Sequence, residues 1–221
     1  MGFDFHVLRQ YAPELFGGLL NTLWIVAGSL ALATLLGLLG CLGSLTERGL
    51  LFRMSRWYID LFRVIPDVVL IFWVYFCLPL LFDVRLPGGV SGVLALGLGT
   101  GAFMAEVFRA GVLAVPQGQV EAALALGIPT AERWRRVILP QAIRRMMPAF
   151  INTLTDLLKH SSLLAGIAVG EMSYVAYTVG AQTFRYVEML STVAIAYFVI
   201  IFPLSQYARR VERQTRRRTG Q

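Results

Sequence analysis

Hydrophobic and polar residues are distributed along this 221-residue chain in long blocks, and not in the short periods of a soluble helix or strand. A helix that crosses a bilayer needs roughly 20 predominantly apolar residues. Five blocks come close to this length or exceed it: 18–42, 65–82, 90–114, 148–168 and 190–207. The second and the fourth contain charged residues, which makes them the weaker predictions. The pattern predicts an all-α polytopic membrane protein with five transmembrane helices in a single domain that covers residues 1–221.

The composition supports this class of protein. Hydrophobic residues make up 57% of the chain and the mean hydropathy is +0.65, which is far above an ordinary soluble domain. Cys41 and Cys77 lie in apolar blocks, and the two histidines, His6 and His160, are far apart in the sequence. We therefore expect the cysteines to serve in packing, and we predict neither a disulfide nor a metal site.

Arginine is concentrated in alternate polar segments. The segments 43–56 and 115–147 and the tail after residue 207 are rich in arginine, whereas 83–89 and 169–189 hold one each. Because basic residues are enriched on the cytoplasmic side of a membrane protein, the N-terminus is predicted outside, and the segment 115–147 and the C-terminus inside. The net charge of +7 is explained by this topology and by anionic membrane lipid near the tail. We expect no nucleic-acid partner, because the tail lacks interleaved aromatic residues.

The segment 115–147 is a long polar segment between two apolar blocks. Good helix formers from Gln119 to Leu126 predict a short helix, and Gly127 follows where a helix C-terminus favours positive φ. Thr130 is predicted to cap a second helix. A helix of two turns is marginal in water and needs a surface to pack on. From the residues alone, the segment is either a docking element for another protein or a connector between two spans.

Several short motifs follow one another between about residue 16 and residue 205. They are Leu19-Leu20-Asn21-Thr22-Leu23, Phe62-Arg63 with Pro66, Ala105-Glu106-Val107-Phe108-Arg109-Ala110-Gly111, Glu121-Ala122-Ala123 with Gly127, Arg136-Val137-Ile138-Leu139-Pro140-Gln141-Ala142, Leu157-Leu158-Lys159-His160-Ser161-Ser162-Leu163 and Val169-Gly170-Glu171. In this order and spacing they resemble the permeases of bacterial polar amino acid ABC importers, the family of histidine, glutamine and glutamate permeases. Val64 and Ile65 replace a Gly-Thr pair of that family, and Asp67 stands where an apolar residue is usual.

The resemblance implies a type I ABC importer fold that works by alternating access in the bacterial inner membrane. It implies that a cytoplasmic ATPase dimer docks on a coupling surface made of Glu121, Ala122, Ala123, Gly127, Leu139 and Pro140. It also implies a second permease subunit, identical or a sister, and a periplasmic or lipid-anchored solute-binding protein. The chain has no Gly-x4-Gly-Lys-Ser/Thr phosphate loop, so ATP and Mg²⁺ are expected on the separate ATPase. We expect neither a cofactor nor a catalytic residue in this chain.

The fourth apolar block carries the densest set of polar residues. Asn152, Asp156, Lys159 and His160 follow the spacing i, i+4, i+7 and i+8, which places them on one face of a helix. Because ionisable side chains are costly in lipid, this face is expected to line a watery pathway or to meet the second permease. The alternative is an internal Asp156–Lys159 ion pair that holds the helices together. The candidate pathway residues are Asn152, Asp156, Lys159, His160, Ser161 and Ser162.

Two further groups of charges lie near the ends of predicted spans. Glu106 and Arg109 are three residues apart and are predicted to form a structural ion pair. Asp60, Arg63 and Asp67 are predicted to cluster where a proline kinks the second span. Whether Asp67 lines the pathway is left open.

His160 bears on the substrate, because the resembling permeases often have aspartate or asparagine at that position. Histidine removes a negative charge, which favours glutamate, aspartate or glutamine over a cationic amino acid. An opine or a sulfur amino acid is the alternative substrate. An ion-coupled secondary transporter is disfavoured, because five spans give no inverted repeat. An intramembrane enzyme is disfavoured, because His160 and Ser162 point about 200° apart on a helix.

Overall fold

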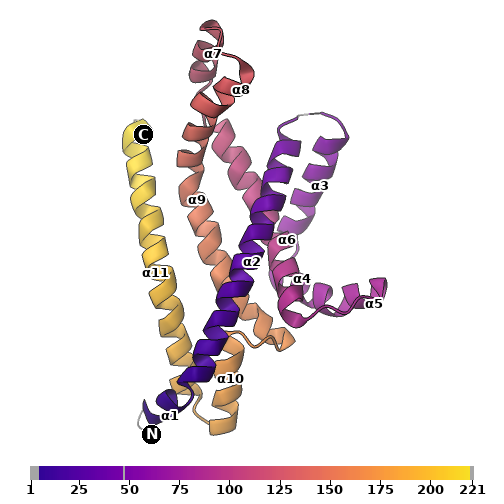
Figure 1. Cartoon of the computed structure of the whole chain (residues 1–221), viewed down its shortest axis with the longest axis vertical. Helices are drawn as coiled ribbons and strands as arrows, with labels where there is room; N and C mark the ends of the chain where they lie inside the picture. The colour runs from indigo at the N-terminus through magenta and orange to yellow at the C-terminus, as the bar shows by residue number, and fades with distance from the viewer. Residues whose placement is uncertain (1–4, 47, 220–221) are drawn as a thin grey trace.

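The computed structural model describes the backbone of residues 5–46 and 48–219 and the side chains of residues 6–46 and 48–214. All regular structure in these residues is helical, so the predicted all-α class is confirmed (Figure 1). Within the described residues, three helices are long and apolar enough to cross a membrane: α2 (Ala12–Ser44), α6 (Gly88–Leu113) and α11 (Tyr186–Thr219). Two bent helix pairs raise this number to five if each pair crosses once.

The first bent pair covers the region where a kinked span was predicted at residues 65–82. It comprises α3 (Leu50–Val64), α4 (Asp67–Phe72), the π-helical turn η1 (Trp73–Cys77) and α5 (Leu78–Phe82). The chain turns by 105° between α3 and α4. Pro66 causes the break, because the residue before a proline avoids the helical region, and Ile65 is indeed extended at φ −71° and ψ 125°. The predicted kink is therefore a full break, and the helix before it starts at Leu50, inside the segment predicted as a loop.

The second bent pair replaces the span predicted at residues 148–168. Its first member runs through α8 (Thr130–Arg133), the π-helical turn η2 (Trp134–Ile138), α9 (Leu139–His160) and the 3₁₀ helix η3 (Ser161–Ile167). Its second member is α10 (Met172–Thr183), and the bend between the two is 46°. The helix extends beyond the start of the predicted span, because α9 begins at Leu139 and Pro148 lies inside it. Membrane helices accommodate an internal proline where neighbouring helices and local backbone adjustments satisfy the freed carbonyl groups.

Small residues allow α2 and α6 to pack closely. A methyl group added at Gly37 would lie 2.6 Å from Met104 Cβ, and one added at Gly40 would lie 2.9 Å from Ala105 Cβ. Small residues are the usual means of close approach between membrane helices. A buried apolar cluster is contributed by α2, α4, η1, α6, α9 and η3. Its most buried members are Ile25, Ile71, Val74, Ala95, Leu96, Leu157 and Leu164.

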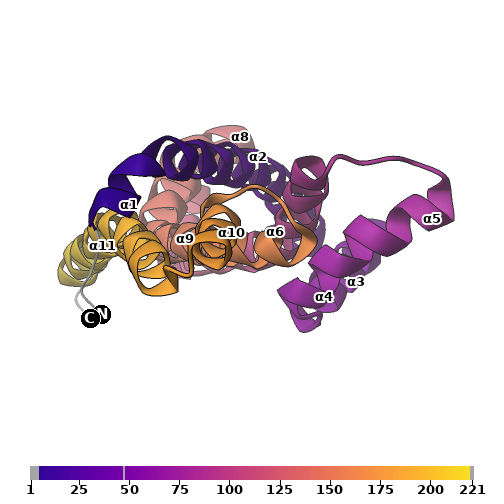
Figure 2. The same ribbon diagram turned by 90° about the horizontal axis from the view of Figure 1, so that it is seen from below.

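The helices divide the molecule into two ends and one lateral arm. Figure 1 shows α7 (Gln117–Ala125) and α8 (Thr130–Arg133) at the same end as the C-terminal part of α11. We call this the α7 end; α1 (Phe5–Gln10) and α10 lie at the opposite end, the α10 end. Figure 2 shows α3, α4 and α5 set to one side of the other helices. The cytoplasmic location of the α7 end stays a prediction from the arginine pattern.

Candidate functional site

The coupling segment folds much as its residues predict. The helix α7 spans Gln117–Ala125, two residues longer at its start than predicted, and Gly127 adopts φ +70° directly after it. The predicted C-terminal glycine is confirmed. The predicted capping by Thr130 is wrong, because Pro129 occupies the cap position of α8 and no side chain caps the helix. The Thr130 hydroxyl instead accepts a long hydrogen bond of 3.4 Å from Arg133.

α7 is held by a small apolar cluster and presents its remaining surface to the exterior. Val120 of α7 packs with Val115, Trp134, Ile138 and Ala142, so this nine-residue helix has the supporting surface it needs. The predicted coupling residues that stay exposed are Glu121, Ala122, Gly127, Leu139 and Pro140, whereas Ala123 is 4% exposed and faces inward.

Two exposed leucines extend this surface and were missed in the sequence. Leu124 is 54% exposed and Leu126 is 78% exposed, both at the tip of the α7 end. The sequence Leu124-Ala125-Leu126 could have revealed them. Two leucines that are two residues apart point in nearly opposite directions on a helix, so a helix with one buried face cannot bury both. A groove of about 380 Å³ beside Glu121, lined also by Val120 and Trp134, completes the surface.

Polar side chains from three helices line a second, smaller cavity near the break between α3 and α4. Its volume is about 100 Å³, and it is lined by Asp67 of α4, Thr100 and Phe103 of α6, and Thr153, Asp156, Leu157 and His160 of α9. We call it the central cavity. Of the predicted pathway residues, it gathers Asp156 and His160. Thr100, Phe103 and Thr153 were missed. The hydroxyl group of Thr100 stands out in an apolar stretch of α6, whereas Thr153 lies among many polar residues of α9 and gives no separate signal.

The other predicted pathway residues lie elsewhere. Lys159 Nζ is 3.0 Å from Asp156 Oδ1, and both side chains are more than half exposed, so the alternative ion pair exists at the surface of the subunit. Ser161 is fully buried and donates a hydrogen bond to the Leu158 carbonyl. Ser162 donates to the Lys159 carbonyl, and Asn152 is exposed on α9. These four candidates therefore do not line the central cavity, and their part in the pathway or in the contact with a second permease stays a prediction.

Asp67 belongs to the central cavity and not to the cluster predicted for it. Asp67 Oδ2 lies 3.1 Å from His160 Nδ1, which joins α4 to α9 across the cavity. Gly99 of α6 makes room for this contact, because a methyl group there would lie 3.0 Å from Asp67 Oδ1. Asp60 instead pairs with Arg56 at 2.9 Å, and the Arg63 guanidinium lies 5.5 Å from the centre of the Phe103 ring. The 105° turn separates Asp67 from the two residues that precede it in α3.

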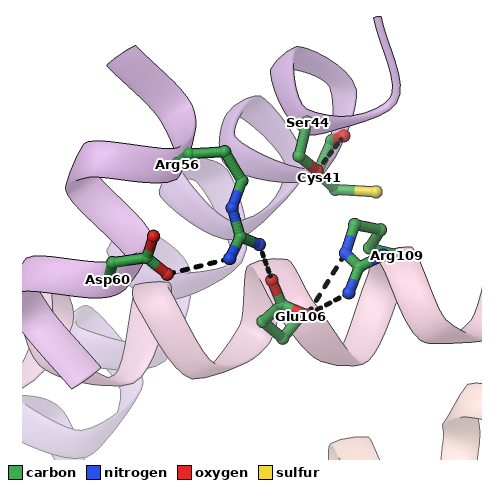
Figure 3. Close-up of polar contacts among 6 residues, drawn as sticks. All are labelled: Cys41, Ser44, Arg56, Asp60, Glu106 and Arg109. Carbon is green, nitrogen blue, oxygen red and sulfur yellow. Dashed lines mark hydrogen bonds and ion pairs between the residues drawn. The ribbon is translucent and has the colours of Figure 1, made fainter. Parts of the chain in front are cut away.

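The Glu106–Arg109 contact is present, and it belongs to a larger network (Figure 3). Glu106 Oε2 lies 2.6 Å from Arg109 Nη2, and Glu106 Oε1 lies 2.6 Å from Arg56 Nη1 on α3. Arg56 also contacts Asp60, so one arginine joins two carboxylates from two helices. The Glu106 side chain is only 18% exposed, and its two guanidinium partners supply the charge and hydrogen bonds that a half-buried carboxylate requires. The network ties the α3 arm to α6.

A buried carboxylate organises the α10 end. Glu171 is fully buried, and its side chain accepts hydrogen bonds from the Ser173 and Tyr174 amides at the start of α10. This satisfies two of the amide groups that a helix N-terminus leaves open. The Tyr197 hydroxyl of α11 donates to the same carboxylate at 3.4 Å, and Asn21 of α2 donates to the Gly170 carbonyl at 2.8 Å. The segment before α10 is thus fixed to both α2 and α11.

The family of the chain follows from comparison with known proteins. Residues 38–217 match the family described as "Binding-protein-dependent transport system inner membrane component", and the chain belongs to it. It is therefore a multi-pass component of the inner membrane and a transport permease.

Individual relatives cover almost the whole chain. The arginine transport system permease protein ArtQ of Bacillus subtilis is 33% identical over 97% of this chain and 98% of its own length. The glutamine transport system permease protein GlnP of Escherichia coli is 35% identical over the same shares. A chain in a crystal structure of an amino acid ABC transporter with histidines superimposes with a TM-score of 0.88 at 31% identity, covering 97% of this chain and all of that one. The chain thus has the fold of an ABC transporter permease.

Proposed function

We propose that this chain is the permease subunit of an ATP-driven importer for polar amino acids. The observation that carries the proposal is the connection between the coupling segment and the central cavity. The segment lies between α6 and α9, and these two helices supply six of the seven residues that line the cavity. The arginine and glutamine permeases among its relatives support an amino acid as the transported molecule.

The proposal includes three partners: an ATPase dimer, a second permease and a solute-binding protein. A cytoplasmic ATPase dimer, which carries ATP and Mg²⁺, docks on the surface formed by Glu121, Leu124 and Leu126. A second permease, identical or a sister, completes the pathway, and a periplasmic or lipid-anchored binding protein delivers the substrate at the α10 end. Closure of the ATPase dimer moves the coupling segment, and α6 and α9 carry this movement to the cavity. The distance along α9 from Leu139 to Asp156 is about 26 Å at 1.5 Å per residue.

The pairing of charges in and beside the central cavity supports a neutral polar substrate. Each carboxylate that lines the cavity has a basic neighbour: His160 for Asp67, and Lys159 for Asp156. Asp67 also supplies the negative charge that is lost when histidine stands at position 160. The histidine alone therefore gives no reason to favour a substrate with an anionic side chain. The cavity presents paired hydrogen-bonding groups with little excess charge. We therefore favour an amide amino acid such as glutamine over glutamate, aspartate or arginine.

The experiment is the ATPase activity of the reconstituted complex with its binding protein, measured with single amino acids. We expect glutamine to stimulate hydrolysis more strongly than glutamate, aspartate or arginine. Binding of the same amino acids to the complex without the binding protein separates the preference of the permease from that of its partner. Stimulation only by arginine or histidine would contradict the substrate assignment. Stimulation only by an opine or a sulfur amino acid would move the substrate to another class, and failure of any ATPase to co-purify would overturn the whole proposal.

A further inference from the structure

A groove at the α7 end combines basic and apolar surfaces. Its volume is about 700 Å³, and it lies between the first turns of α9 and the last turns of α11. It is lined by Pro116, Gln119, Gln141, Ile143, Arg144, Arg145, Met147, Tyr207, Val211 and Gln214. None of these residues contributes to the central cavity or to the exposed surface of α7 at Glu121, Leu124 and Leu126. We call it the α9–α11 groove.

The position of the groove along α11 matches the edge of a bilayer. The apolar part of α11 ends at Tyr207, after a run that exposes Phe198, Val199 and Phe202 on the outside of the molecule. Tyrosine is enriched at the boundary between hydrocarbon and headgroups. From Tyr207 to Gln214 the helix rises about 10 Å, which is enough to cross one headgroup layer of about 5–8 Å. The groove therefore lies where lipid headgroups lie, if α11 crosses the membrane.

The charges around the groove have one predominant sign. Arg144 and Arg145 form one wall, and none of the described residues that line the groove is acidic. Further exposed arginines follow on α11 at Arg209, Arg210 and Arg213, with Glu212 as the single acidic residue among them. A guanidinium group binds phosphate with paired hydrogen bonds, and the amides of Gln119, Gln141 and Gln214 supply additional donors.

The apolar part of the groove distinguishes a lipid from a soluble anion. Ile143 is 43% exposed and Tyr207 is 58% exposed, and Met147 lies beside them. A ligand that satisfies both surfaces has an anionic head and an apolar chain. We propose that the α9–α11 groove binds an anionic phospholipid, with its phosphate on Arg144 and Arg145 and the upper part of its acyl chains against Ile143, Met147 and Tyr207. Basic pockets between membrane helices on the cytoplasmic side are a recognised form of lipid site.

The test measures which lipid stays bound to the purified permease–ATPase complex. The complex is incorporated into bilayers of equal parts phosphatidylglycerol and phosphatidylcholine, extracted in mild detergent, and analysed for retained lipid by native mass spectrometry. The groove variant is Arg144→Gln with Arg145→Gln. The matched control is Arg135→Gln with Arg136→Gln, which removes the same charge from exposed arginines outside the groove.

We expect the wild type and the control to retain phosphatidylglycerol about tenfold over phosphatidylcholine, and the groove variant to lose most of this preference. A second variant, Gln141→Glu, keeps both arginines and places a carboxylate in the groove. It is expected to weaken the same preference, and it keeps the proposal testable if the double variant fails to fold. An excess of inorganic phosphate should leave the retained lipid unchanged, because it has no acyl chain.

Three outcomes would overturn the proposal. One is equal retention of both lipids by the wild type. Another is an equal loss of preference in the groove variant and the control, which would indicate diffuse charge and not a site. The third is a groove variant that loses its ATPase while its lipid preference is unchanged, because the groove would then be a protein interface. None of these outcomes bears on the identity of the transported solute.

Discussion

The coupling segment and the central cavity are both polar regions of a membrane protein, but they are assembled in opposite ways. The coupling segment is made from one continuous stretch, in which α7, Gly127 and α8 follow one another and present their side chains outward. The central cavity gathers single side chains from α4, α6 and α9, which are far apart in the sequence. A change in the coupling segment is therefore expected to affect docking alone, whereas a change in the central cavity should disturb several helices at once.

The largest effect is expected from Glu121→Lys. Glu121 is exposed beside the groove of the α7 end, so reversal of its charge should weaken the ATPase contact without disturbing the helices. We expect ATP-driven uptake to fall about tenfold, which corresponds to about 1.4 kcal/mol of docking free energy. Uptake into proteoliposomes measures this, with Glu132→Lys on α8 as the control. Wild-type uptake by the Glu121 variant would show that this residue is not part of the docking surface.

The next effect is expected from breaking the contact between Asp67 and His160. Asp67→Asn and His160→Ala each remove one partner of the pair across the cavity. Each change should raise the glutamine concentration for half-maximal stimulation of the ATPase about fivefold, with basal hydrolysis unchanged, because a hydrogen bond at a partly exposed site contributes about 1 kcal/mol when both partners are present. The double variant should resemble either single one, because the two residues act together. Fully additive effects would mean that the two side chains act independently.

A smaller effect is expected from Gly99→Ala. The added methyl group would lie 3.0 Å from Asp67 Oδ1, so the carboxylate must shift by a few tenths of an ångström. We expect a loss of apparent substrate affinity of about two- to threefold, which is less than the about 1–3 kcal/mol that overpacking of a core costs, because only the end of one side chain has to move. Gly17→Ala is the matched control, because nothing lies within 4 Å of its new methyl group. Equal behaviour of the two variants would remove the role assigned to Gly99.

The smallest effect is expected from Arg56→Gln. Glu106 loses one guanidinium partner but keeps Arg109, so the carboxylate is not left without a counter-charge. We expect a loss of about 1 kcal/mol in stability, visible as a lower thermal unfolding midpoint, and little change in uptake. Arg53→Gln, on the same helix, controls for the loss of charge. A large loss of uptake at unchanged stability would instead give the network a part in transport.

Local sequence signals predicted the coupling segment better than the cavity. The helix formers before Gly127 and the positive φ of that glycine are properties of neighbouring residues, and both are found in the structure. The contact between Asp67 and His160 depends on a 105° turn and on the space at Gly99, and the sequence of one helix carries neither. The pattern around Pro66 predicted a kink, yet the size of the turn decides whether Asp67 faces Asp60 or His160. Ser161 follows the polar face directly in the sequence but points away from it, and it is buried 3.4 Å from the Tyr197 hydroxyl of α11.

The most direct test examines the coupling segment and the central cavity in one measurement. In a complex whose Cys41 and Cys77 are replaced by alanine, Thr153→Cys places a thiol in the central cavity. Its modification by a membrane-impermeant reagent is measured from each side of the bilayer, with the ATPase nucleotide-free and again with ATP and vanadate. We predict that the thiol reacts from one side in the first state and from the other in the second, and that Glu121→Lys abolishes this exchange. Identical reactivity in both states would contradict the claim that the coupling segment controls access to the cavity.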